Sequence, residues 1–249
     1  MARQKGLVII KGTFDGLNFY LRKGEPLVRK SGGGFTSKAI KSKPSMIRVR
    51  ENGSEFGRCM VAVKHFKIAL FPLLTLFKDG KRHQRLVQLF TQIKQCDSIS
   101  ERGKRSVGAG MQTDAGRALF AKYVFSSGSN LSAILGHSFH FEWSVNGFTV
   151  SDFSTSSIQF PKGATHIELI VGWLAFDFAT YDYSFYKSDF VLISKESTQT
   201  SLQIPPTELP LTEGARIGIV FMRFAQEINN VSYPFKEAER LVMEVVYLA

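Results

Sequence analysis

Cysteine is scarce in this sequence, with only Cys59 and Cys96 among 249 residues. There is no C-x-x-C pair and no histidine-rich cluster, which argues against a disulfide framework and against the common zinc-binding spacings. Both cysteines occupy apolar positions of helical patterns. The sequence therefore predicts buried free thiols and a reducing compartment.

Long apolar runs are also missing. The longest, residues 68–77, has about half of the ~20 residues that a membrane-spanning helix needs. Near the N-terminus only residues 7–10 form an apolar run, which is too short for the core of a signal peptide. We therefore expect no transmembrane segment, no signal peptide, and a place in the cytoplasm or in an assembled particle.

The short motifs that mark a nucleophile or a phosphate loop are absent. There is no G-x-S-x-G, and the glycines at 32–34 lack the Gly-Lys-Ser/Thr ending of a P-loop, which favours a hinge there. His137 and His140 would point to opposite faces of a predicted strand and could not bind one metal ion together. The sequence thus predicts no catalytic residue, no metal and no cofactor.

Acidic residues of the second half are the remaining candidates for catalysis. They are scattered along predicted strands: Glu142, Glu168, Asp177, Asp182 and Asp189. Two of them could form the carboxylate pair of a hydrolase. Acids on exposed strand faces are the commoner explanation of such a pattern.

Negative charge is sparse in the first part of the chain. Residues 1–105 contain 23 Lys and Arg against 7 Asp and Glu, a net charge of +16, whereas residues 106–249 contain 9 against 14, a net charge of −5. The basic part could bind an external polyanion or dock on the acidic part of a neighbouring copy. The third alternative is that its lysines are simply solvated.

Turn signals predict a small sheet at the N-terminus. Asp15-Gly16 and Lys23-Gly24 separate three β-rich segments, residues 7–11, 17–22 and 26–30, and Asp-Gly is a strong hairpin signal. So small a meander cannot form a core by itself. It must pack on the helices or on another subunit.

A helical pattern follows. Residues 44–77 carry apolar side chains at three- and four-residue spacing, which predicts a long helix with one buried stripe. Pro72 should kink or end this helix. We expect a second helix from Lys81 onward.

The period changes to that of β-strands from residue 118. The expected strands are residues 118–125, 139–145, 148–153, 166–178, 181–194, 215–224 and 240–248. Asn146-Gly147 predicts a type I′ turn. The predicted fold class is α+β, with a basic β-meander arm (1–43), a helical connector (44–110) and an antiparallel β-sandwich of immunoglobulin or jelly-roll type (111–249).

Two groups of side chains are candidate contact residues. The first is basic and is expected to contact an anionic partner or a neighbouring copy: Arg22, Lys23, Arg29, Lys30, Lys38, Lys41, Lys43, Arg48 and Arg50. The second is aromatic: Phe176, Phe178, Tyr181, Tyr183 and Phe185. We expect it to fill the core or a subunit interface rather than stack bases, because only Lys187 supplies positive charge nearby.

Two segments carry a resemblance to a known family. Residues 11–20 (KGTFDGLNFY), followed by Gly24 and Arg29, and residues 50–57 (RENGSEFG) resemble a family of proteins of similar length found widely in Bacteroidetes genomes. The resemblance is good in this N-terminal part and only general in the sheet half. It implies a bacterial protein without a secretion signal and no particular activity. A weaker resemblance is to the cytoplasmic protein tubules of gliding members of that phylum.

The sequence therefore favours a non-enzymatic structural subunit that assembles with itself into a tubule, filament or shell. The alternative is a basic protein that binds or packages nucleic acid through phosphate contacts that do not read sequence. A carbohydrate-binding sandwich is the weaker alternative.

Overall fold

The computed structural model describes residues 2–6, 8–32, 36–128, 130–136, 139–229, 231–235 and 240–249. His137 and most of the glycine hinge at residues 32–34 lie outside these ranges. The chain divides into two compact units, Met1–Arg50 and Glu51–Ala249, which we call the N-terminal unit and the main unit. The segments predicted as helical connector and as sandwich fall together in the main unit, because helices and strands share one hydrophobic core.

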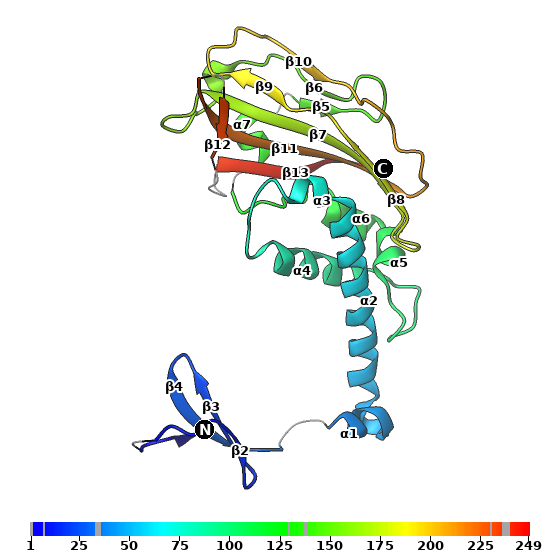
Figure 1. Cartoon of the computed structure of the whole chain (residues 1–249). Coiled ribbons are helices and arrows are strands. Elements are labelled where there is room, and N and C mark those ends of the chain that lie inside the picture. Colours follow the sequence, from blue (N-terminus) through cyan, green and yellow to red (C-terminus); the bar gives the residue numbers. More distant parts are fainter. Residues whose placement is uncertain are drawn as a thin grey trace. The chain divides into compact units, whose positions relative to one another are not determined.

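A four-stranded antiparallel sheet in the order β1-β4-β3-β2 forms most of the N-terminal unit (Figure 1). Its strands are β1 (Ala2–Arg3), β2 (Gly12–Phe14), β3 (Leu17–Arg22) and β4 (Glu25–Lys30). Both predicted turns are confirmed. Asp15, Gly16, Lys23 and Gly24 all have positive φ, the backbone conformation that a two-residue type I′ turn needs at both central positions.

The prediction of a strand at residues 7–11 is wrong over its described part, residues 8–11. The side chain of Gln4 bonds both backbone groups of Ile10: Nε2 donates to the carbonyl at 3.1 Å, and Oε1 accepts from the N–H at 3.0 Å. An amide side chain thus takes the place of a partner strand. Pairing with β3 begins only at Gly12.

The two predicted helices are confirmed. The first corresponds to the 3-10 helix η1 (Pro44–Met46), α2 (Ile47–Ala69) and α3 (Phe71–Leu74), and the second to α4 (Arg82–Gln95). A further helix, α1 (Ser37–Ser42), lies in the segment predicted as the basic arm. Pro72 lies in the first turn of α3, where its missing N–H costs no helical hydrogen bond. Shorter helices follow: α5 (Val107–Met111), α6 (Asp114–Phe120), α7 (Leu131–Leu135) and the 3-10 helix η2 (Thr155–Ser157).

Two antiparallel sheets complete the main unit. In the larger one, the long strands β7 (His166–Phe176) and β11 (Ala215–Ile228) pair along their length. Their flanking strands are β8 (Tyr183–Lys187), β9 (Val191–Ser194), β12 (Val231–Pro234) and β13 (Leu241–Leu248). The smaller sheet has the order β10-β6-β5, with β5 (Phe139–Phe141), β6 (Phe148–Val150) and β10 (Leu202–Ile204).

The larger sheet is buried on both faces. Along β7, Ile170 and Leu174 face the helices, while Val171 and Trp173 face the smaller sheet. Figure 1 shows α2 to α6 on one side of the sheet and β5, β6 and β10 on the other. A strand covered on both sides is expected to be apolar on both faces, which explains the continuous apolar run of β7 from Leu169 to Phe176. The fold is thus a mixed α and β fold with antiparallel sheets, as predicted.

Residues 118–125 depart from the predicted strand. Thr113 caps a helix here, since its Oγ1 accepts from the Gly116 N–H at 3.0 Å, and α6 continues to Phe120. Only the end of the segment is strand-like, with the Phe125 N–H donating to the Met243 carbonyl at 2.7 Å. The local cap therefore outweighs the β propensity of the following apolar residues.

The hairpin predicted around Asn146-Gly147 is confirmed, because β5 and β6 pair in antiparallel register. The type I′ turn is wrong. Of its two central residues only Gly147 has positive φ, and the loop spans residues 142–147. A Cβ at Gly147 would lie 2.2 Å from the Ile204 carbonyl oxygen. Close packing against the chain at β10 therefore sets this turn.

Candidate functional site

The N-terminal sheet has one apolar face. Residues that pair across strands point to the same side, and the register pairs Leu17 with Phe14, Phe19 with Val28, and Leu21 with Pro26. These six residues form what we call the apolar sheet face: Phe14, Leu17, Phe19, Leu21, Pro26 and Val28. Lys30, which pairs with Leu17, lies on the same side of the sheet. The alternation of apolar and polar residues from Leu17 to Arg22 already signals such a face, but the sequence reasoning did not use it.

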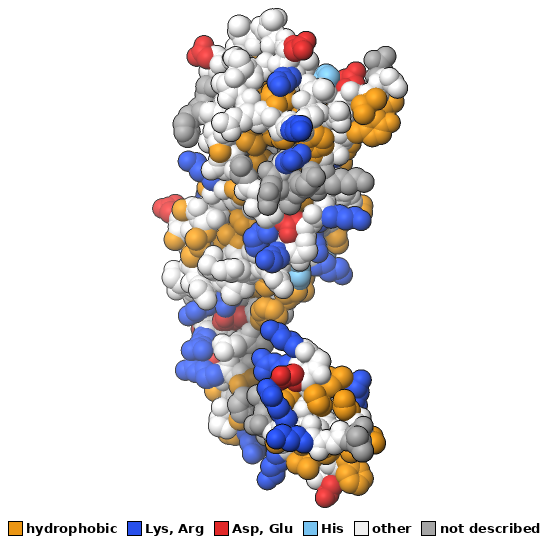
Figure 2. Space-filling model, turned by 90° about the vertical axis from the view of Figure 1, so that its left-hand side faces the viewer, with side chains coloured by type: hydrophobic (Ala, Val, Ile, Leu, Met, Phe, Trp, Pro, Cys, Tyr) orange, Lys and Arg blue, Asp and Glu red, His pale blue; other side chains and the backbone are white. Residues whose placement is uncertain are grey.

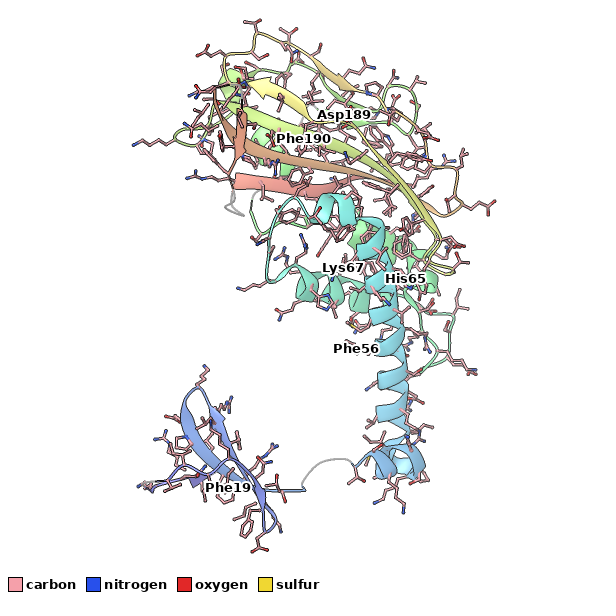
Figure 3. All side chains as sticks on the ribbon, in the orientation of Figure 1. Phe19, Phe56, His65, Lys67, Asp189 and Phe190 are labelled. Carbon is pink, nitrogen blue, oxygen red and sulfur yellow. The ribbon has the colours of Figure 1, made fainter. Side chains whose placement is uncertain are left out.

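Within its own unit the apolar sheet face has little cover. Phe14 is 75% exposed, and Leu17 and Leu21 are about 40% exposed; Phe19, labelled in Figure 3, is half-buried. No side chain among the described residues of the N-terminal unit is fully buried. A small sheet normally gains its stability by burying such a face, so this unit lacks a core of its own.

The opposite face of the sheet is basic. Arg22 and Arg29 lie on it, and the Arg29 guanidinium sits 5.4 Å from the centre of the Tyr20 ring. Arg3 pairs with Glu25 at 3.1 Å, with both side chains largely exposed. The unit holds 12 Lys and Arg against 2 Asp and Glu, a net charge of +10, whereas the main unit holds 20 against 19. In the lower part of Figure 2, which contains this unit, basic side chains (blue) far outnumber acidic ones (red).

The nine basic candidates fall in two parts of the N-terminal unit. Arg22, Lys23, Arg29 and Lys30 belong to the sheet or its turn; Lys38, Lys41, Lys43, Arg48 and Arg50 belong to the segment from α1 to the start of α2. All except Arg50 are exposed. The Arg50 guanidinium donates to the carbonyls of Ile40 at 2.7 Å and Lys43 at 3.0 Å. Arg50 therefore ties α1 to α2.

The five aromatic candidates are divided between the core and the surface. Phe176 and Phe178 are buried among the helices, both in ring contact with Phe66. Phe185 and Tyr181 are half-buried, Tyr181 stacking on His65 at 4.9 Å. Tyr183 is 41% exposed on β8. β8 has no strand neighbour on its outer side within the part of the chain that the structure describes.

The segment RENGSEFG lies on α2 and holds the loop at residues 101–105. Glu55 is 3% exposed, and its carboxylate accepts from Lys94 Nζ at 2.6 Å and from the Gly103 N–H at 2.8 Å. Arg58, one residue beyond the segment, donates to the carbonyls of Gly103 and Arg105. The buried polar residue of this segment is thus structural. Phe56, in contrast, is 51% exposed (Figure 3).

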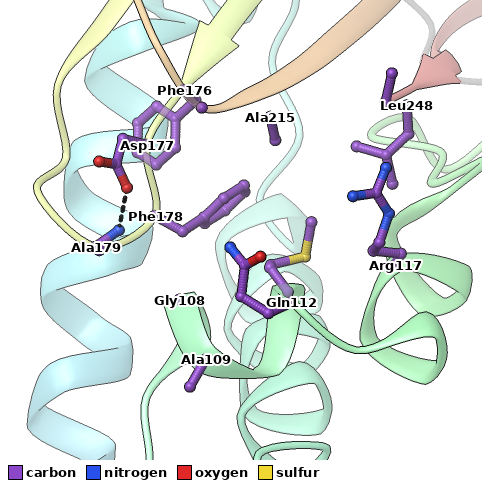
Figure 4. Close-up of a pocket in the computed structure, with 13 residues that line it drawn as sticks. Gly108, Ala109, Gln112, Arg117, Phe176, Asp177, Phe178, Ala179, Ala215 and Leu248 are labelled. Atoms are coloured by element: carbon purple, nitrogen blue, oxygen red, sulfur yellow. Dashed lines mark hydrogen bonds between the residues drawn. The ribbon is translucent and has the colours of Figure 1, made fainter.

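A cavity of about 480 Å³ lies where α5 and α6 meet the ends of β7, β11 and β13 (Figure 4). Its charged side chains are Arg117 and Asp177. Asp177 Oδ1 accepts from the Ala179 N–H at 2.7 Å, and this backbone bond, against the effect of burial, lowers the pKa of Asp177. The carboxylate is therefore engaged in its own turn. No Ser, Cys or His is found among the described residues that line the cavity.

Metal-binding and membrane-spanning features are not found in the described ranges. No group of three or more His, Cys, Asp or Glu side chains there could hold a metal ion. Within the same ranges, no helix combines the length and the apolar character needed to cross a bilayer.

Comparisons with protein-family models, with curated proteins and with solved structures find no match. The resemblance of residues 11–20 and 50–57 to a bacterial family therefore stays a prediction.

Proposed function

We propose that this chain is a non-enzymatic structural subunit that assembles with copies of itself through the N-terminal unit. The observation that carries the proposal is the apolar sheet face, with Phe14, Leu17 and Leu21 exposed and no buried side chain among the described residues of the unit. Contiguous exposed apolar surface of this kind marks an interaction site. A partner that covers this face would supply the core that the small sheet lacks.

Charge favours a second copy as that partner. The N-terminal unit carries +10, whereas residues 177–214 of the main unit carry six Asp and Glu against two Lys, a net charge of −4. This acidic segment includes β8 and β9, whose outer edge could accept an added strand. A basic sheet docking there would form a contact between two different surfaces. Such contacts produce open polymers when the rotation between subunits does not close.

The two facing sheets of the main unit would then form the body of the subunit, with the immunoglobulin-like or jelly-roll-like sandwich as the proposed finer class. Tubule, filament and shell are the forms that repeated contacts of this kind generate. Of the two predicted resemblances, only the weaker one, to cytoplasmic protein tubules, bears on this proposal.

The test is light scattering coupled to size exclusion, with negative-stain microscopy, across protein concentration and salt. We expect polymers of the full chain, and a double variant, Leu17→Glu with Leu21→Glu, should remove the contact through the N-terminal sheet and sharply reduce their size. The matched control places the same two charges on the opposite face, Thr13→Glu with Asn18→Glu, and should retain assembly. A wild-type chain that stays monomeric at high concentration and low salt would refute the proposal.

A second candidate, nucleic-acid binding, is favoured by one observation. Eight of the nine basic candidates are exposed, in a unit of charge +10 that has only two acidic residues. Phosphate contacts by such residues would give an affinity that falls steeply with salt. Fluorescence anisotropy with a generic duplex, after nuclease treatment of the protein, tests this candidate. It is removed if no binding occurs at low salt.

A further inference from the structure

The helical layer of the main unit carries an apolar groove of about 570 Å³, formed by α2, α3 and the start of α4. Its apolar lining consists of Met60, Val63, Ile68, Phe71 and Leu74. Phe71 is 64% exposed and Ile68 is 45% exposed. Large apolar side chains thus remain in water although a recess for an apolar partner lies between them.

Positive charge surrounds this groove. Its basic lining residues are Lys64, Lys67, Arg82 and His83, and no Asp or Glu lines it. Arg82 is fixed in place, since its guanidinium donates to the Leu74 carbonyl at 2.9 Å and lies 4.7 Å from the Phe77 ring centre. Lys64, Lys67 and His83 make no hydrogen bond or ion pair within the described part of the chain. The groove therefore suits an apolar group flanked by negative charge.

The loop between β10 and β11, which does not line the groove, displays such a group. Leu211 is 90% exposed, more than any other large apolar residue described. Exposed acidic residues flank it on both sides, Glu208 and Glu213. Since Leu211 is so exposed, it does not occupy the groove of its own molecule.

The loop is held rigidly around Leu211. Pro210 is buried, and Leu209 packs on the core between the two sheets. The negative charge of Glu208 raises the pKa of the Tyr186 hydroxyl, so these two side chains lie close together. An apolar side chain displayed on an anchored loop loses little conformational entropy on binding, as is typical of an interface anchor.

We propose that Leu211 of one copy inserts into the groove of the next copy, with Glu208 and Glu213 facing the lysines of its rim. This inference rests on the proposed self-assembly, for which it supplies a second contact. Leu211, which we call the knob, and the groove lie on different surfaces of the same unit. The contact is therefore heterologous and propagates from copy to copy. An anionic amphiphile would satisfy the same groove, and the experiment separates the two occupants.

The experiment uses the full chain in the Leu17→Glu, Leu21→Glu background, where the contact through the N-terminal sheet is removed. Sedimentation velocity across concentration should still show self-association. Leu211→Glu should weaken it about thirtyfold or more, the loss expected for an interface hot spot, and Ile68→Glu should do the same. The control Ile99→Glu, at a side chain that is 86% exposed, should leave association unchanged.

Mixing gives the decisive result. The Leu211→Glu chain keeps an intact groove and the Ile68→Glu chain keeps an intact knob, so the mixture should form one-to-one dimers although each chain alone is monomeric. If the Ile68→Glu chain fails to fold, Lys67→Glu replaces it as the groove variant. A partner chain with Glu213→Lys should then restore binding to the Lys67→Glu groove. Absence of mixed dimers would overturn the inference.

Two other outcomes separate the inference from the proposed function. If the wild type polymerises and the knob and groove variants polymerise equally well, only the inference fails. If the wild type is monomeric throughout, both fail. Saturable binding of decanoate that Ile68→Glu abolishes, with no effect of Leu211→Glu on self-association, would assign the groove to an anionic amphiphile and overturn the inference.

Discussion

Replacing Glu55 with Ala is expected to destabilise the main unit strongly. The carboxylate is 3% exposed and joins two elements, since it accepts from Lys94 Nζ on α4 at 2.6 Å and from the Gly103 N–H of the 101–105 loop at 2.8 Å. The Lys94 side chain is itself only 12% exposed. Truncation would leave a nearly buried ammonium without a counter-charge.

Breaking a buried ion pair by removal of one partner costs about 3–5 kcal/mol, and the orphaned Gly103 N–H adds to this cost. Glu55→Gln should cost less, because the amide oxygen can still accept from Gly103 while Lys94 loses only its counter-charge. A double variant, Glu55→Gln with Lys94→Gln, should recover part of the loss, because no unpaired charge remains.

The effect should depend on pH with a defined sign. Burial acts to raise the pKa of Glu55, but the bonds from Lys94 and Gly103 outweigh it and hold the pKa below its usual 4.5. A carboxyl with a lowered folded-state pKa contributes stability that is present above the unfolded pKa and is lost as pH falls through the folded value. The difference between wild type and Glu55→Gln should therefore be full at pH 7 and shrink below about pH 4.5.

Urea unfolding followed by the fluorescence of Trp173, which is buried between the sheets, measures these free energies. The matched control is Glu101→Gln, which removes one partner of the exposed Glu101–Lys104 pair, both side chains being more than 75% exposed; no measurable change is expected. If Glu55→Ala unfolds at the same urea concentration as the wild type, the carboxylate is not the tie between α2, α4 and the loop.

Three further predictions concern single residues. Burial raises the pKa of the Cys59 thiol, which is 1% exposed. A thiol reagent should therefore modify Cys96 in the native protein and Cys59 only after unfolding. Equal rates of modification of the two thiols in the native protein would contradict this. Gly53→Ala should raise the free energy of unfolding by about 1 kcal/mol, because a Cβ there meets open space, and a loss of stability in urea would show that the space is filled. Burial raises the pKa of Glu244, whose Oε2 accepts from the Leu131 N–H at 2.7 Å. The stability that Glu244 contributes is therefore lost as pH rises through its folded-state pKa. Glu244→Gln should be more stable than the wild type at pH 7. Thermal melts should show that this difference vanishes below pH 4.5.

Features set by a few neighbouring residues could be read from the sequence. The turns at Asp15-Gly16 and Lys23-Gly24 follow from glycine's tolerance of positive φ. The break before Pro72 follows from its missing N–H. The β-rich second half and the separation of charge follow from composition alone.

Features that depend on distant residues could not be read in this way. The strand-like end of the 118–125 segment depends on Met243, whose carbonyl accepts from the Phe125 N–H. The RENGSEFG segment gives no sign that its second glutamate meets Lys94, 39 positions later. The three predicted domains become two units because Phe66 on α2 and Phe176 on β7 meet in one core.

The sequence by itself determined the tight turns at Asp15-Gly16 and Lys23-Gly24, the class of fold and the basic character of the first 50 residues. Only the tertiary structure decided which apolar residues are buried and which, such as Leu17 and Leu211, remain exposed. The physical reason is that conformational preference belongs to a residue and its neighbours, whereas burial depends on which distant segments the folded chain brings together.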